Sequence, residues 1–82
     1  MVIVWDEPKR VANLAKHGLD FAALDIEFFA AATIRPAKGG RLAAFGLLAG
    51  ERIAVVFAAL GDEAVSIVSM RPASRKERTL YA

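Results

Sequence analysis

The sequence predicts an α+β domain with a small antiparallel sheet of about four strands, two N-terminal helices and a C-terminal helix. Apolar residues between positions 7 and 31 recur at helical spacings of three and four, whereas those between positions 41 and 70 form three β-favouring runs. The turns between these runs are short, and short turns join antiparallel strands. A chain of 82 residues has room for a single domain, residues 1–82.

The composition limits the class of protein. Hydrophobic residues make up 56% of the chain, but no apolar run approaches the ~20 residues that a membrane helix needs, so no membrane association is expected. Cysteine is absent, which excludes disulfides and thiolate metal sites, and with a single histidine the sequence predicts neither a metal nor another cofactor. Asp6 and Glu7 directly follow the apolar residues 1–5, so we expect no secretory signal and a cytoplasmic protein.

The chain begins with a predicted strand and helix. Val2–Trp5 favours a strand, and Asp6 is suited to cap the helix that follows, with Pro8 in the first turn. The helix is predicted over about residues 7–17, and Gly18 is suited to the left-handed conformation that ends it.

This first helix has an apolar and a polar stripe. By helical spacing, the face expected to meet the core carries Val11, Leu14 and Ala15. The opposite stripe carries Lys9, Asn13, Lys16 and His17. Trp5 is expected to anchor the core from the preceding strand.

A second helix is predicted over about residues 21–31, with Asp20 as its N-cap. Asp25 and Glu27 are expected to face away from the core. The apolar side chains of this helix are Phe21, Leu24, Ile26, Phe28 and Phe29. The segment from Thr33 to Gly40 contains proline and adjacent glycines, and it is predicted to be the longest loop.

The sheet is predicted from three successive strands, at about residues 41–48, 52–59 and 64–70. The middle strand is apolar on both faces, which predicts a central position. Gly46 interrupts the first strand, and a glycine within a strand often marks a bulge.

The last strand leads into a basic C-terminal segment. Pro72 keeps the preceding residue extended, and Ser74 with Glu77 has the spacing of a capping box that opens a helix. Residues 70–82 hold four basic residues and one acidic residue, which predicts a phosphate-bearing or acidic partner; a solvated helix face has the same composition. The residues expected to lie close together at this joint are Arg71, Arg75, Arg78 and Tyr81.

Two motifs lie at the ends of the chain. The first is Val4-Trp5-Asp6-Glu7-Pro8-Lys9, followed by Asn13, Lys16-His17-Gly18 and Phe21; the second is Ile67-Val68-Ser69-Met70-Arg71-Pro72-Ala73-Ser74, followed by Glu77-Arg78 and Tyr81. Together they resemble the BrnT toxin family. The resemblance implies a RelE-like fold and a ribonuclease that acts on RNA. It also implies a partner, a BrnA-like antitoxin with a ribbon-helix-helix domain, and contact with DNA only through that antitoxin. Leu60 and Ser66 stand where family members often carry arginine.

RNA cleavage without a metal requires activation of the 2′-hydroxyl, stabilisation of the phosphorane and protonation of the leaving 5′-oxygen. Arg71 and Arg78 are the candidates for the phosphorane, because guanidinium groups match phosphate oxygens. His17 is the candidate general acid or base, since histidine changes charge near neutral pH, although its place before a glycine also suits a structural role at the helix dipole. Glu77 is either a base or a capping residue. The candidates for RNA binding are Lys9, Lys16, Arg75, Lys76 and Tyr81.

Two other functions stay open at the level of sequence. Leu60 and Ser66 favour a catalytically impaired toxin-fold protein that only binds its antitoxin. The basic terminal helix is also compatible with a small nucleic-acid-binding regulator. If the protein leaves RNA intact but still binds its antitoxin, it is the catalytically impaired toxin-fold protein and not an enzyme.

Overall fold

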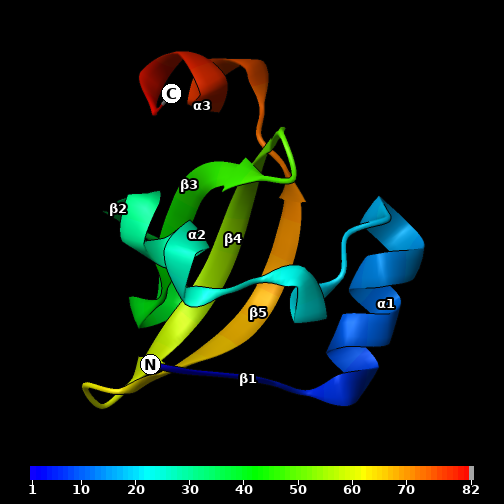
Figure 1. The fold of residues 1–82 in the computed structure, drawn as a ribbon, viewed down its shortest axis with the longest axis vertical. Helices are drawn as coiled ribbons and strands as arrows, with labels where there is room; N and C mark the ends of the chain where they lie inside the picture. Colours follow the sequence, from blue (N-terminus) through cyan, green and yellow to red (C-terminus); the bar gives the residue numbers. More distant parts are fainter. Residues whose placement is uncertain (82) are drawn as a thin grey trace.

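The computed structural model describes residues 1–81 and contains a mixed five-stranded sheet with helices at one face, one edge and one end (Figure 1). The strands are β1 (Val2–Trp5), β2 (Thr33–Pro36), β3 (Leu42–Leu48), β4 (Glu51–Leu60) and β5 (Ala64–Pro72). Their order is β1-β5-β4-β3-β2, with β1 parallel to β5 and the other neighbours antiparallel. The α+β class and the central position of β4 are therefore confirmed, and the sheet has one strand more than expected.

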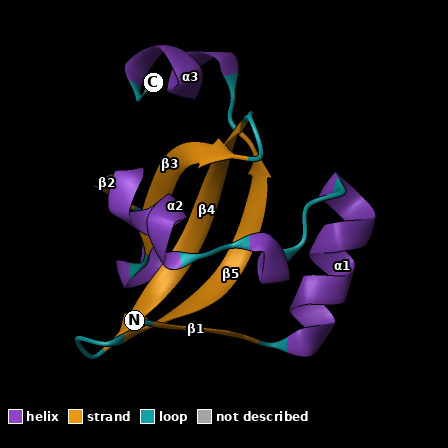
Figure 2. Ribbon diagram, in the orientation of Figure 1, coloured by secondary structure: helices purple, strands orange, loops and turns teal. Residues whose placement is uncertain are grey.

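The helices are α1 (Glu7–His17), η1 (Phe21–Ala23), α2 (Ile26–Ala31), η2 (Lys38–Gly40) and α3 (Arg75–Leu80), of which η1 and η2 are single 3₁₀ turns (Figure 2). The bounds of α1 agree with the prediction, and Gly18 ends it in the left-handed region at φ 69°. Within residues 1–81, no helix is long and apolar enough to span a membrane.

The second predicted helix is divided into η1 and α2. Asp20 caps η1 by accepting a hydrogen bond of 2.9 Å from the N–H of Ala22. Asp25, expected only to face away from the core, caps α2 by accepting 2.8 Å from the N–H of Phe28. A side-chain carboxylate that binds nearby backbone N–H groups ends one helical segment and starts the next, which is why the apolar pattern does not produce one continuous helix.

The segment predicted as the longest loop contains strand β2. It pairs with β3 from Thr33↔Phe45 to Pro36↔Leu42, and Pro36 is tolerated because it lies at the end of an edge strand. Gly39 and Gly40, at φ 70° and 74°, then turn the chain back toward β3.

The main core lies between one face of the sheet and the segments η1 and α2. Its buried side chains are Phe21, Leu24, Phe28, Ala44, Ile53, Val55, Phe57, Val65, Ile67 and Met70, with Trp5 packed against them as expected. Gly46 marks a close approach rather than a bulge, because a Cβ atom there would lie 3.1 Å from the Phe28 ring. The bulge lies between β4 and β5, where Val68 is the extra residue.

Helix α1 packs with its polar stripe inward, opposite to the prediction. Val11 and Leu14 are 53% and 38% exposed, whereas Asn13 is buried. The Asn13 side chain accepts a hydrogen bond of 3.1 Å from the N–H of Met70 and donates one of 3.1 Å to the carbonyl of Leu19. β1 pairs with β5 only as far as Trp5↔Ile67, so α1 lies against the free edge of β5, where a polar side chain satisfies backbone groups.

Candidate functional site

A cleft of about 450 Å³ lies between α1 and the second half of β5. Its lining residues are Lys9, Ala12, Asn13, Lys16, His17, Val68, Ser69 and Arg71. The size is within the range of small ligand sites. The structure thus brings together four of the residues that the sequence marks as candidates, three from α1 and one from β5.

The helical spacing explains why three of these residues face the cleft. Asn13 is fixed to β5 through Met70, and Lys9, Lys16 and His17 lie four before, three after and four after it. Residues at these spacings share one side of a helix. The hydrogen bonds of Asn13 therefore also orient the basic side chains toward β5.

Arg71 reaches the cleft from β5 and is held by Glu77 of α3. Its two terminal nitrogens, Nη1 and Nη2, donate to the two carboxylate oxygens of Glu77 at 2.6 and 2.8 Å, and Nη1 also donates to the carbonyl of Pro72. The side chain of Arg71 remains 42% exposed, against 19% for Glu77. Because a guanidinium has five N–H donors, Arg71 retains donors for a ligand.

Glu77 has the capping-box role that the sequence favoured. Its carboxylate accepts 2.9 Å from the N–H of Ser74, while the hydroxyl of Ser74 accepts 3.1 Å from the N–H of Glu77. The hydrogen bonds from Arg71 and the N–H of Ser74 lower the pKa of Glu77 to about 2, and the carboxylate in turn raises the pKa of Arg71. A carboxylate this acidic is a weak general base.

The other C-terminal candidates do not line the cleft. Arg78 and Tyr81 line a second, small cavity of about 10 Å³ together with Arg52 and Glu77, and Arg75 and Lys76 are exposed on α3. The predicted joint is therefore divided, with Arg71 on one side of Glu77 and Arg78 on the other.

Tyr81 is enclosed by protein groups. Its ring stacks on Phe45 with 4.4 Å between the ring centres, and the guanidinium carbon of Arg35 lies over the ring at 5.4 Å. The ring therefore packs on the sheet at Phe45 while Tyr81 stays half-buried. RNA binding by Tyr81 stays a prediction.

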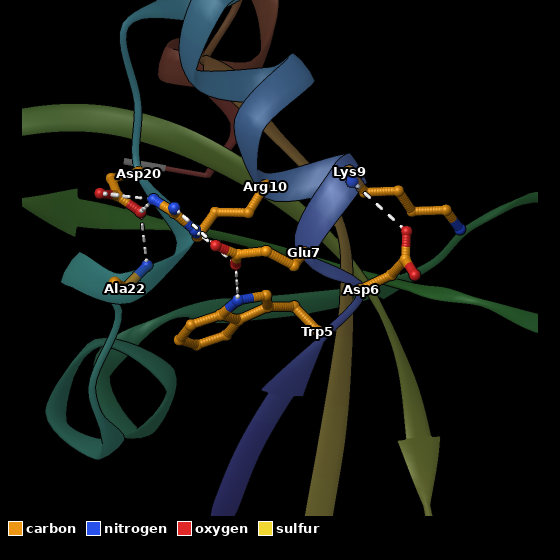
Figure 3. A network of polar contacts seen from close by, with 7 residues as sticks. All are labelled: Trp5, Asp6, Glu7, Lys9, Arg10, Asp20 and Ala22. Carbon is orange, nitrogen blue, oxygen red and sulfur yellow. Dashed lines mark hydrogen bonds and ion pairs between the residues drawn. The ribbon is translucent and has the colours of Figure 1, made fainter.

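A polar network that the sequence did not reveal fixes the start of α1 (Figure 3). Glu7 accepts 3.0 Å from the indole N–H of Trp5 and two hydrogen bonds of 2.7 Å from Arg10, which also contacts Asp20 at 3.2 Å. Arg10 and the indole lower the pKa of Glu7 to about 2, and the N–H of Ala22 with Arg10 lowers the pKa of Asp20. The network joins β1, α1 and η1, and the Glu7–Arg10 spacing of three residues is its only sequence signal.

A cleft whose charged lining is cationic, carried by a small α+β domain, is the arrangement typical of proteins that bind anionic ligands. The family described as "Ribonuclease toxin, BrnT, of type II toxin-antitoxin system" matches residues 5–77. The crystal structure of the Brucella abortus ribonuclease toxin BrnT is similar, with a TM-score of 0.85 and 55% sequence identity over 92% of this chain and 99% of that one. A comparison with curated protein sequences finds no match. The chain belongs to the BrnT family of ribonuclease toxins, a class that acts on RNA and is paired with a cognate antitoxin.

Leu60 and Ser66, the positions at which the resemblance implied arginine in other members, lie on the sheet face that carries Arg71. Ser66 pairs with Ala58. Side chains alternate between the two faces of a strand, and the extra residue Val68 shifts this alternation by one position. Ser66 and Arg71 therefore point to the same face of the sheet although they are five residues apart. Leu60 is 49% exposed at the far end of β4. Arginines at positions 66 and 60 would therefore both lie on the Arg71 side of the sheet. Position 60 would be further from Arg71 than position 66, because it lies at the opposite end of β4 from Ala54, the partner of Arg71.

Proposed function

We propose that the cleft between α1 and β5 is where this toxin cleaves RNA, by acid–base chemistry that requires no metal. The observation that supports this assignment is the convergence of His17, Lys9 and Lys16 from α1 with Arg71 from β5 on one concave surface. A titratable group beside fixed cations is what transesterification of an RNA phosphodiester by its own 2′-hydroxyl requires.

In this proposal Arg71 binds the scissile phosphate and stabilises charge that accumulates on its oxygens. Glu77 is a positioning residue, since its carboxylate fixes the plane of the guanidinium at 2.6 and 2.8 Å. His17 takes the proton from the 2′-hydroxyl as that oxygen attacks phosphorus, and the leaving 5′-oxygen takes its proton from water; in the reverse assignment His17 protonates the 5′-oxygen and water accepts the 2′-proton. Lys9 and Lys16 hold the phosphate groups beside it.

The donor set of the cleft supports the metal-independent route. Among the described residues that line it, the charged and titratable side chains are lysine, arginine and histidine, without a carboxylate. Mg²⁺ is bound in proteins mainly through carboxylate and other oxygen ligands, and fixed cations oppose its approach. In this proposal the lysines and Arg71 take over the neutralisation of phosphate charge.

For the partner, we propose a BrnA-like antitoxin with a ribbon-helix-helix domain. The cationic cleft is the surface whose occupation would stop RNA binding, and an acidic antitoxin segment laid across it would complement its charge. The toxin would then meet DNA only through the antitoxin, and an RNA substrate implies a cytoplasmic site of action.

The test is cleavage of a single-stranded RNA by the purified protein in excess EDTA. We expect products ending in 2′,3′-cyclic phosphate, because the neighbouring 2′-hydroxyl is the nucleophile. An RNA with 2′-deoxyribose at the cleaved position should stay intact. Cleavage that stops in EDTA and resumes on addition of Mg²⁺ would contradict the metal-independent chemistry.

His17 requires a comparison of two variants. If it transfers a proton, both His17→Ala and His17→Gln should lose cleavage and relieve growth arrest while remaining folded. Activity lost in His17→Ala but kept in His17→Gln would instead indicate a structural role at the end of α1.

Ser66 and Leu60 favour a second candidate function, a toxin-fold protein that binds its antitoxin without cleaving RNA. Both residues replace a cation on the sheet face that Arg71 shares. RNA left intact by a protein that forms a stable antitoxin complex would support this candidate, and Ser66→Arg should then introduce cleavage.

A further inference from the structure

Three arginines from three different elements surround Tyr81, outside the cleft. Arg35 of β2 lies over its ring at 5.4 Å, and Arg52 of β4 and Arg78 of α3 line a small cavity of about 10 Å³ beside it, together with Glu77. Arg52 and Tyr81 also line an adjoining cavity of about 190 Å³. This arginine cluster was not apparent from the sequence, because Arg35 lies in a segment predicted to be a loop.

The three arginines of the cluster are exposed, and they differ from the half-buried Arg10 and Arg71 in their partners. Arg10 pairs with Glu7 and Asp20, and Arg71 pairs with Glu77. Within residues 1–81, no Asp or Glu side chain forms an ion pair with Arg35, Arg52 or Arg78. Glu77 lines the same cavity as Arg52 and Arg78, but its carboxylate is paired with Arg71. A net positive charge therefore remains at the cluster, and such a charge favours binding of an anion.

The arginine cluster and the cleft open onto the same face of the sheet. Arg71 pairs with Ala54, which pairs with Phe45, and Arg52 lies two residues from Ala54 on the same side of β4. Arg35 pairs with Ala43, two residues from Phe45. A band of arginines therefore extends from β5 to β2, over three inter-strand steps of about 4.8 Å, or roughly 14 Å, with the apolar cluster of Phe45, Ala54 and Tyr81 between them.

The packing of Tyr81 indicates which part of RNA this band recognises. Stacking of a base requires an open aromatic face, and Phe45 already stacks on this half-buried ring. The guanidinium of Arg35 lies over the ring, and its Nη1 donates to the carbonyl of Ile34, which leaves the other N–H groups to donate to phosphate oxygens.

We propose that Arg35, Arg52 and Arg78 form a phosphate-binding subsite for the single-stranded RNA backbone that flanks the cleaved bond. The subsite rests on the proposed function of the cleft, because it extends the path of the same RNA strand. It supplies affinity that does not depend on base sequence.

The experiment measures binding of 2′-O-methyl RNA, which cannot be cleaved, at several salt concentrations. The probes are a dinucleotide and a ten-nucleotide strand, with wild type, Arg35→Gln/Arg52→Gln and the matched control Arg41→Gln, an exposed arginine that lines none of these surfaces. We expect the double variant to bind the longer strand about tenfold or more weakly, with a salt dependence reduced by about 1 to 2 in log–log slope, and to bind the dinucleotide unchanged.

Companion measurements separate the subsite from the proposed function. For cleavage of the longer RNA, the double variant should raise KM and keep kcat, and Arg35→Lys/Arg52→Lys, which retains both charges, should recover most of the affinity. Wild-type affinity in the glutamine variant would overturn the subsite while leaving cleavage in the cleft untouched. Unchanged RNA binding with weakened antitoxin binding would overturn it too, and would reassign the arginines to the protein partner. Failure of the wild type to cleave, with binding still sensitive to Arg35 and Arg52, would contradict only the proposed function.

Discussion

Arg71 and Glu77 join the last strand to the terminal helix through two parallel hydrogen bonds of 2.6 and 2.8 Å. Glu77 also closes the capping box with Ser74, so one carboxylate both starts α3 and orients the arginine of the cleft. The shape of the C-terminal segment and the direction of a proposed phosphate ligand therefore depend on the same side chain.

Substitution of Arg71 should reduce the chemical step of RNA cleavage. We expect Arg71→Ala to lower kcat by roughly 10² to 10³, the effect of removing one preorganised donor to a developing anion, and Arg71→Lys to recover little of it because lysine cannot bind both carboxylate oxygens of Glu77. Single-turnover cleavage gives the rates. Arg78→Ala should act mainly on KM, since it lines a different cavity; an equal loss of kcat in that variant would show that both arginines act on one phosphate.

Glu77→Gln should separate orientation from charge. The amide retains the size of the carboxylate but cannot accept two hydrogen bonds from Arg71, so we expect kcat to fall by about tenfold while the dinucleotide is bound as before. Glu27→Gln, on the exposed side of α2, is the matched control and should cleave like wild type. A Glu77→Gln enzyme with wild-type kcat would remove the positioning role.

Acid should destabilise the protein through Glu77. Its pKa is about 2 in the folded protein and 4.5 ordinarily, so the unfolded chain takes up the proton first as the pH falls. The stabilisation is complete above about pH 4.5 and is lost progressively toward pH 2. Urea unfolding at pH 7, 4 and 2.5 should show a steeper decline for wild type than for Glu77→Gln. Glu7, whose pKa is also about 2, contributes a decline that persists in the variant.

Asn13→Ala should destabilise the fold. The change leaves the N–H of Met70 and the carbonyl of Leu19 without the partners described above, at a cost of roughly 1–3 kcal/mol for buried polar groups. Leu14→Ala, at an exposed position of the same helix, should cost less than about 0.5 kcal/mol. Urea unfolding monitored by circular dichroism measures both, and equal effects would show that α1 is held mainly by apolar contacts.

Gly46→Ala tests the close approach of α2 to β3. The added methyl group would lie 3.1 Å from the Phe28 ring and 3.3 Å from the Ala32 side chain, and overpacking of this kind costs roughly 1–3 kcal/mol. The double variant Gly46→Ala/Phe28→Leu should be less destabilised than the two single changes predict together, because the smaller side chain makes room. If the destabilisation of the double variant equals the sum of the two single effects, the added methyl group at position 46 does not clash with the Phe28 ring.

Local chemistry made several elements predictable from the sequence. Asp6, Gly18 and the Ser74–Glu77 pair act on backbone groups within four residues of themselves, so their roles do not depend on the rest of the fold. The same holds for the apolar run of β4, which has to be buried on both faces wherever it lies.

The orientation of α1 and the existence of β2 could not be predicted in this way. Helical spacing indicates which side chains share a face, but not that the neighbour of that face is a free strand edge whose N–H groups favour Asn13 over Val11 and Leu14. β2 is a four-residue, largely exposed strand, and it exists because β3 offers it partners. The sequence consequently identified the cleft residues individually and missed the arginine cluster.

The contact between Asn13 and Met70 has a further consequence for the solubility of the toxin. Beyond Trp5 the backbone of β5 would otherwise be an open edge, and open edges recruit strands from other chains. Helix α1 blocks this edge with the residues that build the cleft. Loosening the helix would therefore abolish activity and expose an aggregation-prone strand in one step. Variants that detach α1 from β5, such as Asn13→Ala, should precipitate more readily than variants such as His17→Gln that only remove a proposed catalytic group.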